Sequence, residues 1–292
     1  MAKQFKGVYA VPCTAFTEGG EVDEAAMRKH LRFLLDEGGV HGMIPTGSTG
    51  EFAFLSPDER ERVLQITIDE VAGEVPVVAG AAGVSTRETI AFAQSAQQAG
   101  ADGVMVVSPY YGHPDQEELY HHFKDLAESI DIPVMLYNNP GAAGVDILPP
   151  LVARLAELEG VAAIKESTGE MQRVAEIMRL CGDSIEVLCG CDTLPMEMFA
   201  MGVQGWVAAP SNVIPKQCVE LYELVAVDKD FERGKELYFK ILPLFTMFES
   251  TGKYVQLAKA ALDMLGRPIG PPRQPLLPAA DALRAQLGTI LD

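Results

Sequence analysis

The residue with the clearest chemical potential is Lys165, which directly follows the apolar stretch 161–164 and precedes a Glu-Ser-Thr-Gly sequence. Such a stretch predicts a buried strand with a cation at its C-terminal end. Because an ammonium group is costly to desolvate, a buried lysine tends to lose its proton. A neutral amine in a dry pocket can attack a carbonyl carbon and form a Schiff base. The alternative is a lysine that extends along the surface until its amine reaches solvent.

Two further positions can assist such chemistry. Tyr137 ends the apolar stretch 133–136, and its hydroxyl can relay protons beside an amine; the alternative is a core tyrosine with a satisfied hydroxyl. Gly47, Ser48 and Thr49 offer two hydroxyls, backbone N–H groups and a close approach for a small anion. We interpret this turn as a carboxylate cradle, with an ordinary strand-to-helix turn as the alternative.

Nucleotide and metal sites are disfavoured by the same sequence. The Gly-Ser-Thr-Gly turn lacks the lysine of a P-loop and the three glycines of a dinucleotide-binding motif. Cys189 and Cys191 form a Cys-Gly-Cys pair, but no second pair or His-rich spacing completes four ligands. The five histidines are scattered along the chain. We therefore expect no metal site and no cofactor.

The elements that must position these residues alternate between short apolar strands and amphipathic helices. This alternation requires a parallel sheet, because parallel neighbours are joined by crossover helices. Eight such units at this length favour a closed (β/α)8 TIM barrel over an open sheet. The expected strands are 7–12, 41–45, 76–81, 103–107, 133–137, 161–165, 185–188 and 205–209.

The barrel prediction brings the chemical residues together, because active sites of such barrels lie at the C-terminal ends of the strands. Lys165 and Tyr137 end consecutive strands and should be neighbours. Tyr111 and Gly190 follow two other strands, at the same face. The predicted catalytic barrel spans residues 1–227, and residues 228–292 show no strand pattern but helical stretches at 231–247, 253–265 and 279–291. We expect this C-terminal helical region to pack on the barrel.

Composition narrows the function classes. The 292 residues are 48% hydrophobic, and the formal net charge of −18 argues against binding nucleic acid or anionic membranes. An anionic substrate must then be held by local donors. The N-terminus lacks the long apolar region of an export signal, and no apolar run is long enough to span a bilayer. Five cysteines are an odd number for a disulfide framework, which favours a reduced, cytoplasmic protein.

Four motifs in order and spacing resemble the dihydrodipicolinate synthase / N-acetylneuraminate lyase family, over nearly the full length. They are Gly-Ser-Thr-Gly-Glu at 47–51, Pro-Tyr-Tyr at 109–111, Leu-Tyr-Asn-Asn-Pro at 136–140 and Ile-Lys-Glu-Ser-Thr-Gly at 164–169. The resemblance implies a TIM barrel, usually a homotetramer built as a dimer of dimers, and a class I aldolase mechanism without a cofactor.

The resemblance also implies residue roles. Lys165 forms the Schiff base with pyruvate or another 2-oxo acid, Tyr137 shuttles protons, and Ser48 and Thr49 hold the carboxylate and link the relay. Tyr111 corresponds to the tyrosine that reaches a neighbouring subunit's site in the synthases. Gly47 and Gly190 join the substrate-binding set.

Two departures from the family pattern bear on the substrate. The synthases carry an arginine two residues after the proline of the Tyr-Asn-x-Pro motif, where it binds the second substrate's carboxylate; Ala142 occupies this position here. The sialic acid lyases also lack the arginine, but they have an Asp-Glu pair after strand seven that binds the polyol tail. Here Asp192 is followed by Thr193.

These observations predict a Schiff-base lyase acting on pyruvate or a related small 2-oxo acid. Aldol cleavage or condensation, dehydration and deamination through a lysine imine are all compatible with it. The first alternative is an authentic 4-hydroxy-tetrahydrodipicolinate synthase of lysine biosynthesis. The second is a catalytically silent barrel that binds small acids, although a pure binding protein has no need of a dry lysine.

Overall fold

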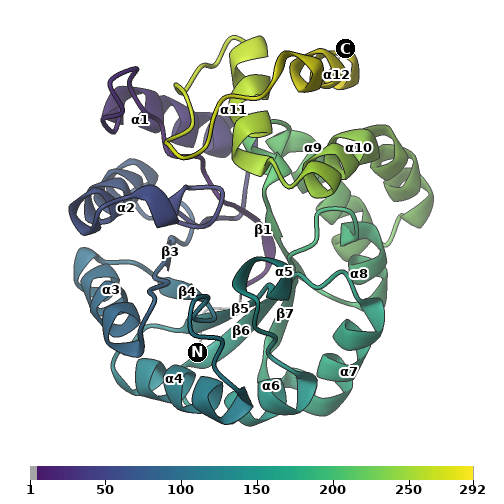
Figure 1. The fold of residues 1–292 in the computed structure, drawn as a ribbon. Helices are drawn as coiled ribbons and strands as arrows, with labels where there is room; N and C mark the ends of the chain where they lie inside the picture. Colours follow the sequence, from purple (N-terminus) through teal and green to yellow (C-terminus); the bar gives the residue numbers. More distant parts are fainter. Residues whose placement is uncertain (1–4, 292) are drawn as a thin grey trace.

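The computed structural model describes residues 5–291, which contain eight parallel β-strands arranged around one axis (Figure 1). Their order in the sheet is β2-β1-β8-β7-β6-β5-β4-β3. A parallel bridge between Met43 and Val77 joins the two outermost strands and nearly closes the barrel. The strands are β1 (Gly7–Ala10), β2 (Gly42–Met43), β3 (Val78–Gly80), β4 (Gly103–Val107), β5 (Val134–Asn138), β6 (Val161–Glu166), β7 (Glu186–Cys189) and β8 (Gly205–Ala208).

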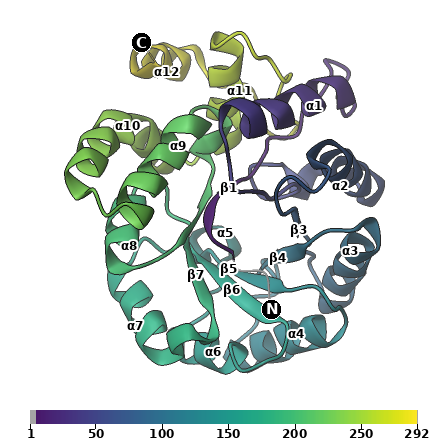
Figure 2. The ribbon, with the colours of Figure 1, turned by 180° about the vertical axis from the view of Figure 1, so that it is seen from behind.

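Helices follow the strands and surround them, as both axial views show (Figures 1 and 2). Side-chain caps help to fix where they begin; for example, Ser56 and Glu59 form a reciprocal capping box on α2. The helices are α1 (Glu24–Arg32), α2 (Pro57–Val71), α3 (Thr86–Ala99), α4 (Gln116–Glu128), α5 (Pro140–Ala143), α6 (Pro149–Leu155), α7 (Met171–Cys181), α8 (Pro195–Met201), α9 (Pro215–Tyr222), α10 (Phe231–Thr251), α11 (Tyr254–Met264) and α12 (Asp281–Leu291).

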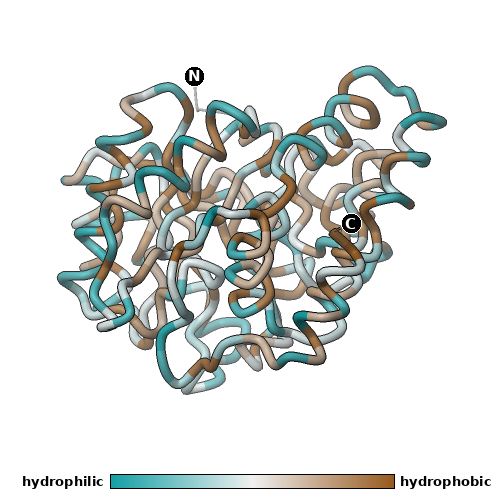
Figure 3. The backbone as a smooth tube through the Cα atoms, turned by 90° about the horizontal axis from the view of Figure 1, so that it is seen from above, coloured by the Kyte–Doolittle hydropathy of each residue, from teal (hydrophilic) through white to brown (hydrophobic). Residues whose placement is uncertain are grey.

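The buried apolar side chains form two clusters because successive residues of a strand point to opposite faces. One cluster fills the barrel and includes Tyr9, Ile44, Met105 and Leu188. The other lies between the strands and the surrounding helices and includes Trp206. Hydrophilic stretches lie on many of the outer turns (Figure 3). The interior is therefore a packed core, and the site must lie at its mouth.

The structure confirms the predicted barrel with a helical C-terminal part, and it differs from the prediction in two places that matter for the site. A short helix, α5, follows β5 and stands in front of the strand ends in Figure 1. Helix α10 continues beyond the expected end at Met247 to Thr251, with Pro243 inside it. The boundary at residue 227 between two units stays a prediction. No helix within residues 5–291 is long and apolar enough to cross a membrane.

Candidate active site

Lys165 and Tyr137 are direct partners in the register of β5 and β6. The Lys165 side chain is buried, with the residue 7% exposed. Its Nζ lies 4.0 Å from the centre of the Tyr137 ring. The alternative of a solvent-reaching lysine therefore does not apply, because the amine ends against an aromatic face inside the barrel mouth.

The Tyr137 hydroxyl is held by polar neighbours. Asn139 Nδ2 donates a hydrogen bond to it over 2.9 Å. Burial alone raises the pKa of Tyr137, but the positive charge of Lys165 and hydrogen bonds with Asn139, Lys165 and Ser48 outweigh burial, so that the pKa falls below its ordinary value of 10. A phenol with a lowered pKa gives up its proton more readily, as a proton relay requires.

A polar network fixes the ends of β5 and β6 beneath this pair. Asn138 Nδ2 donates to Glu166 Oε2 and to Asp146 Oδ1, each over 3.0 Å. The backbone N–H of Thr168 donates to Glu166 Oε1 over 2.7 Å. Burial raises the pKa of Glu166, and these hydrogen bonds partly offset that effect. Glu166 therefore orients the strand ends rather than facing the substrate.

The turn that carries Ser48 and Thr49 has unusual backbone geometry. Thr46 and Glu51, which flank it, both have left-handed φ angles, of 55° and 62°. Such angles are costly for residues other than glycine, so surrounding contacts must impose them. Thr46 Oγ1 donates to the carbonyl of Gly80 over 2.9 Å. The turn is thus fixed in place before any ligand arrives.

A cavity of about 570 Å³ opens at this end of the barrel. Most of the residues predicted for the site line it together, namely Lys165, Tyr137, Ser48, Thr49, Gly190 and Ala142. Position 190 has room only for glycine, because a Cβ there would lie 2.8 Å from Lys165 Cγ.

Two predicted residues lie apart from the cavity lining. Gly47 sits behind the turn, where a Cβ would come within 2.6 Å of Val11 Cγ1. Because Gly47 has no side chain, the turn can pack closely against Val11. Tyr111 is 83% exposed in the single chain. Their roles toward a substrate stay predictions.

Asp192 and three residues to which the sequence did not point also line the cavity. Asp192 follows β7, Glu249 lies in the last turn of α10, and Tyr254 begins α11. Ser167 also lines the cavity, but its Oγ is inaccessible to solvent and has no hydrogen-bond partner among the described residues. Asp192 was visible as a strand-end acid, whereas Glu249 lies beyond the predicted end of its helix and carried no signal.

Asp192 and Glu249 give this side of the cavity an acidic character. Glu249 Oε1 accepts a hydrogen bond from the backbone N–H of Asp192 over 2.9 Å. Burial, followed by the charge of Glu249, raises the pKa of Asp192 to about 8, while Trp206 Nε1 donates to its Oδ1 over 2.9 Å. Among the described residues that line the cavity, Lys165 is the only lysine or arginine.

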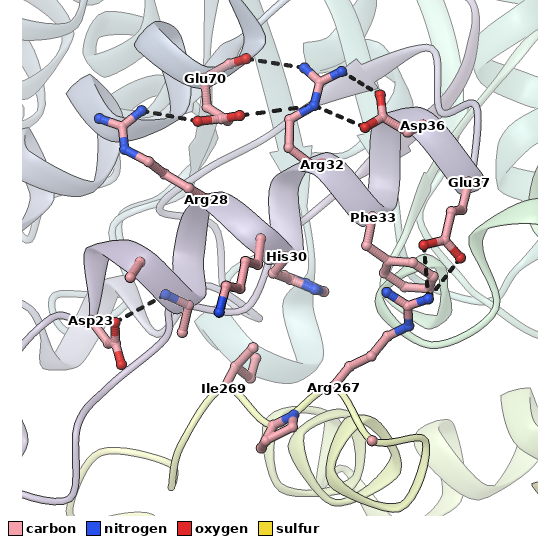
Figure 4. A pocket seen from close by; sticks show the side chains of 15 residues that line it. Asp23, Arg28, His30, Arg32, Phe33, Asp36, Glu37, Glu70, Arg267 and Ile269 are labelled. Atoms are coloured by element: carbon pink, nitrogen blue, oxygen red, sulfur yellow. Dashed lines mark hydrogen bonds and ion pairs between the residues drawn. The ribbon is translucent and has the colours of Figure 1, made fainter.

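A second cavity, of about 720 Å³, lies between α1 and the segment 266–269 (Figure 4). Three arginines line it, and each is paired with a carboxylate: Arg28 with Glu70, Arg32 with Asp36, and Arg267 with Glu37. These ion pairs neutralise the three arginines, and Lys29 also lines the cavity. Within residues 5–291, no group of three or more His, Cys, Asp or Glu residues is placed to hold a metal ion.

The chain is similar over nearly its whole length to known proteins of one family. The Dihydrodipicolinate synthetase family model matches residues 4–292. A 4-hydroxy-tetrahydrodipicolinate synthase from Pelobacter propionicus is 40% identical and covers 98% of both chains. The dihydrodipicolinate synthase from Aquifex aeolicus superimposes with a TM-score of 0.94 at 35% identity, over 98% of this chain and 97% of that one. A monomeric dihydrodipicolinate synthase variant gives 0.94 at 34% identity, over 98% and 96%.

Proposed function

Because the chain belongs to the dihydrodipicolinate synthetase family and is a Schiff-base lyase of that family, we propose that it acts on pyruvate or a related 2-oxo acid through Lys165. The observation that carries this proposal is the buried Lys165 amine against Tyr137, at the mouth of the barrel. A buried lysine beside a tyrosine with a lowered pKa is costly for folding, and such groups are typical of catalytic sites.

The proposed reaction begins with a proton transfer from the Lys165 ammonium to the Tyr137 oxygen. The freed amine attacks C2 of the 2-oxo acid, and Tyr137 then returns its proton to the departing hydroxyl, so that water leaves, an iminium forms and the Tyr137 oxygen is ionised again. In a cleavage, the bond between C3 and C4 breaks, its electron pair moves toward the iminium nitrogen, and Tyr137 accepts the proton of the C4 hydroxyl. The reverse sequence joins the resulting enamine to an aldehyde.

Ser48 and Thr49 are the proposed carboxylate donors. Both line the cavity with Lys165, and the left-handed residues Thr46 and Glu51 flank their turn. Hydrogen bonds to a charged group contribute about 1.5–3 kcal/mol each, and preorganisation avoids spending that energy on ordering the turn. Local donors are needed because the chain carries a net charge of −18.

The authentic lysine-pathway synthase remains the alternative, since relatives of 40% identity bear that name. Ala142 lines the cavity on α5, where the resemblance places an arginine in the synthases. A second substrate with its own carboxylate would lack that partner. We therefore expect weaker condensation with aspartate semialdehyde than cleavage of a hydroxylated 2-oxo acid. Introducing Ala142→Arg should move kcat/KM toward the semialdehyde.

The experiment that tests the proposal is borohydride trapping with pyruvate. The adduct should map to Lys165 by peptide mass spectrometry, and Lys165→Ala should abolish it. Lys259→Ala is not a clean control, because that lysine is buried in an ion pair; the exposed Lys240→Ala is suitable. A chain that binds pyruvate without trapping would instead be the silent small-acid-binding barrel.

Assembly and location complete the proposal. We propose a homotetramer in which Tyr111 reaches a neighbouring subunit, because a tyrosine ring that is 83% exposed is costly to leave in water. All five cysteines are free, which supports a reducing, cytoplasmic environment. Cell fractionation tests the location.

A further inference from the structure

The C-terminal helices supply one part of the active-site cavity, which we call the C-terminal wall and define as Glu249, Tyr254 and the Asp192 behind them. Glu249 ends α10 and Tyr254 begins α11, so a single tight connection at Gly252 holds both side chains at the cavity. Figure 1 shows α10 and α11 at one side of the barrel, following the ring of helices. The wall is therefore part of the same space as Lys165.

The hydrogen bonds within this wall have a definite direction. Glu249 Oε1 accepts from the backbone N–H of Asp192 over 2.9 Å and from Cys191 Sγ over 3.3 Å. The Tyr254 hydroxyl is hydrogen-bonded to Glu249; since a carboxylate only accepts, Tyr254 donates its single proton there. Burial first, and then the charges of Asp192 and Glu249, raise the pKa of Tyr254, so the hydroxyl keeps that proton.

The consequence is that the Tyr254 oxygen can accept a further hydrogen bond, whereas Asp192 keeps a proton below about pH 8 and can also donate one. The Tyr254 oxygen retains its lone pairs after donating its proton, and Glu249 Oε1 accepts hydrogen bonds from the Asp192 N–H and Cys191 Sγ.

We propose that Tyr254 is a specificity-determining residue whose hydroxyl oxygen accepts a hydrogen bond from a hydroxyl or ammonium group of the substrate. The group lies on the part of the substrate away from the carbon attached to Lys165. This inference rests on the proposed function and names the substrate class: hydroxylated 2-oxo acids rather than acids with a second carboxylate. Such a carboxylate would face Glu249 with no cation other than Lys165 lining the cavity.

The test uses the full chain and two pairs of 4-hydroxy-2-oxo acids, with five and six carbons. The members of each pair differ only by a terminal hydroxyl, and each is followed by pyruvate release. The native chain should prefer the hydroxylated members. In Tyr254→Phe, kcat/KM for at least one hydroxylated member should fall roughly 3- to 10-fold, as expected for one lost hydrogen bond, while its partner changes less than about 2-fold. Tyr120→Phe on α4, remote from the cavity lining, is the matched control and should change neither.

A second variant tests whether the negative charge of Glu249 disfavours a substrate with a second carboxylate. Glu249→Gln keeps an acceptor for the Asp192 N–H but removes the negative charge, so activity with succinate semialdehyde as second substrate should rise relative to the hydroxylated aldehyde.

The inference is overturned if Tyr254→Phe lowers kcat/KM equally for both members of a pair, or for neither. It is also overturned if the native chain cleaves no member or prefers the members without the terminal hydroxyl. An unchanged ratio of activity with succinate semialdehyde to activity with the hydroxylated aldehyde in Glu249→Gln has the same meaning. Pyruvate trapping on Lys165 in the same preparations distinguishes a failure of this inference from a failure of the proposed function. Trapping that persists leaves the proposed function intact, whereas its absence from the native chain overturns both.

Discussion

At the scale of single residues, the site combines a buried lysine with a buried tyrosine whose pKa is lowered. Lys165 is a cation held inside the barrel mouth, and Tyr137 is a buried phenol whose pKa is lowered because the charge of Lys165 and three hydrogen bonds outweigh burial. The pairing favours proton transfer, since a proton can pass between the two side chains without solvent. Such pairs are typical of catalytic centres rather than of folding.

Tyr137→Phe tests this pairing. The substitution keeps the ring that contacts Lys165 Nζ at 4.0 Å and removes only the hydroxyl. We expect kcat to fall by roughly 10²–10⁴, as for loss of a general acid–base group, with little change in the unfolding midpoint. Steady-state kinetics and thermal melts of the same samples decide; unchanged turnover, or a variant that does not fold, contradicts the role.

Asp192 predicts a pH dependence of stability. Burial and the charge of Glu249 raise its pKa from 3.8 to about 8 in the folded chain. Between about pH 4 and 8 the folded chain therefore retains a proton that the unfolded chain loses, and this contribution to stability is present below about pH 4 and lost as pH rises toward 8. Asp192→Asn cannot titrate.

The melting temperature of Asp192→Asn minus that of the native chain should consequently increase from pH 5 to pH 8. The exposed Asp228→Asn serves as the control and should show no such trend. A difference that stays constant over this range would mean that Asp192 is ionised in the folded chain throughout.

At the scale of elements, the C-terminal helices hold the Ser48-Thr49 turn through a buried ion pair. Lys259 Nζ on α11 lies 2.7 Å from Glu51 Oε1, and the two side chains are 3% and 0% exposed. The backbone N–H of Arg273 donates to Glu51 Oε2 over 2.7 Å. Because Glu51 also has a left-handed φ of 62°, its charge partners help to maintain the geometry that presents Ser48 and Thr49.

Breaking this pair on one side should be more harmful than replacing both partners. Lys259→Met leaves Glu51 buried without its cation and should reduce the free energy of unfolding by about 3–5 kcal/mol, whereas Lys259→Met with Glu51→Gln should lose less. Denaturant titrations of the native chain, the single variant and the double variant measure this difference. Equal losses would show that the ion pair does not act as a unit.

The same elements show how far the sequence could predict the structure. Strand periodicity and strand-end position predicted the barrel and brought Lys165, Tyr137 and Ser48 to one cavity. The C-terminal wall was not predictable, because helix α10 continues to Thr251, beyond the last clear apolar repeat. Side chains at the end of a helix reach a site only through tertiary packing, which local periodicity does not encode.

At the scale of the whole molecule, the net charge of −18 opposes the approach of anionic 2-oxo acids, so binding depends on the few donors inside the cavity. The Tyr111 ring is 83% exposed in the single chain, and the proposed tetramer would cover it. A relative described as a monomeric variant shares the fold at a TM-score of 0.94, so the barrel itself does not dictate the assembly.

Light scattering should find a tetramer at micromolar concentration, and Tyr111→Ala should shift the population toward smaller species and lower kcat. Leu277→Ala, at another exposed apolar side chain, is the control for a general change in surface hydrophobicity. A native chain that is monomeric and fully active would remove Tyr111 from the site.

The dependence of the Ser48-Thr49 turn on Lys259 and Arg273 has a consequence for biosynthesis on the ribosome. The turn is translated early, but the partners that neutralise and anchor Glu51 emerge only near the end of translation. A nascent chain that has completed all eight strands therefore still carries an unpaired acid beneath its carboxylate turn. Stalled chains released at residue 227 should neither bind pyruvate nor form its borohydride adduct, so premature termination yields an inert barrel rather than an unregulated enzyme.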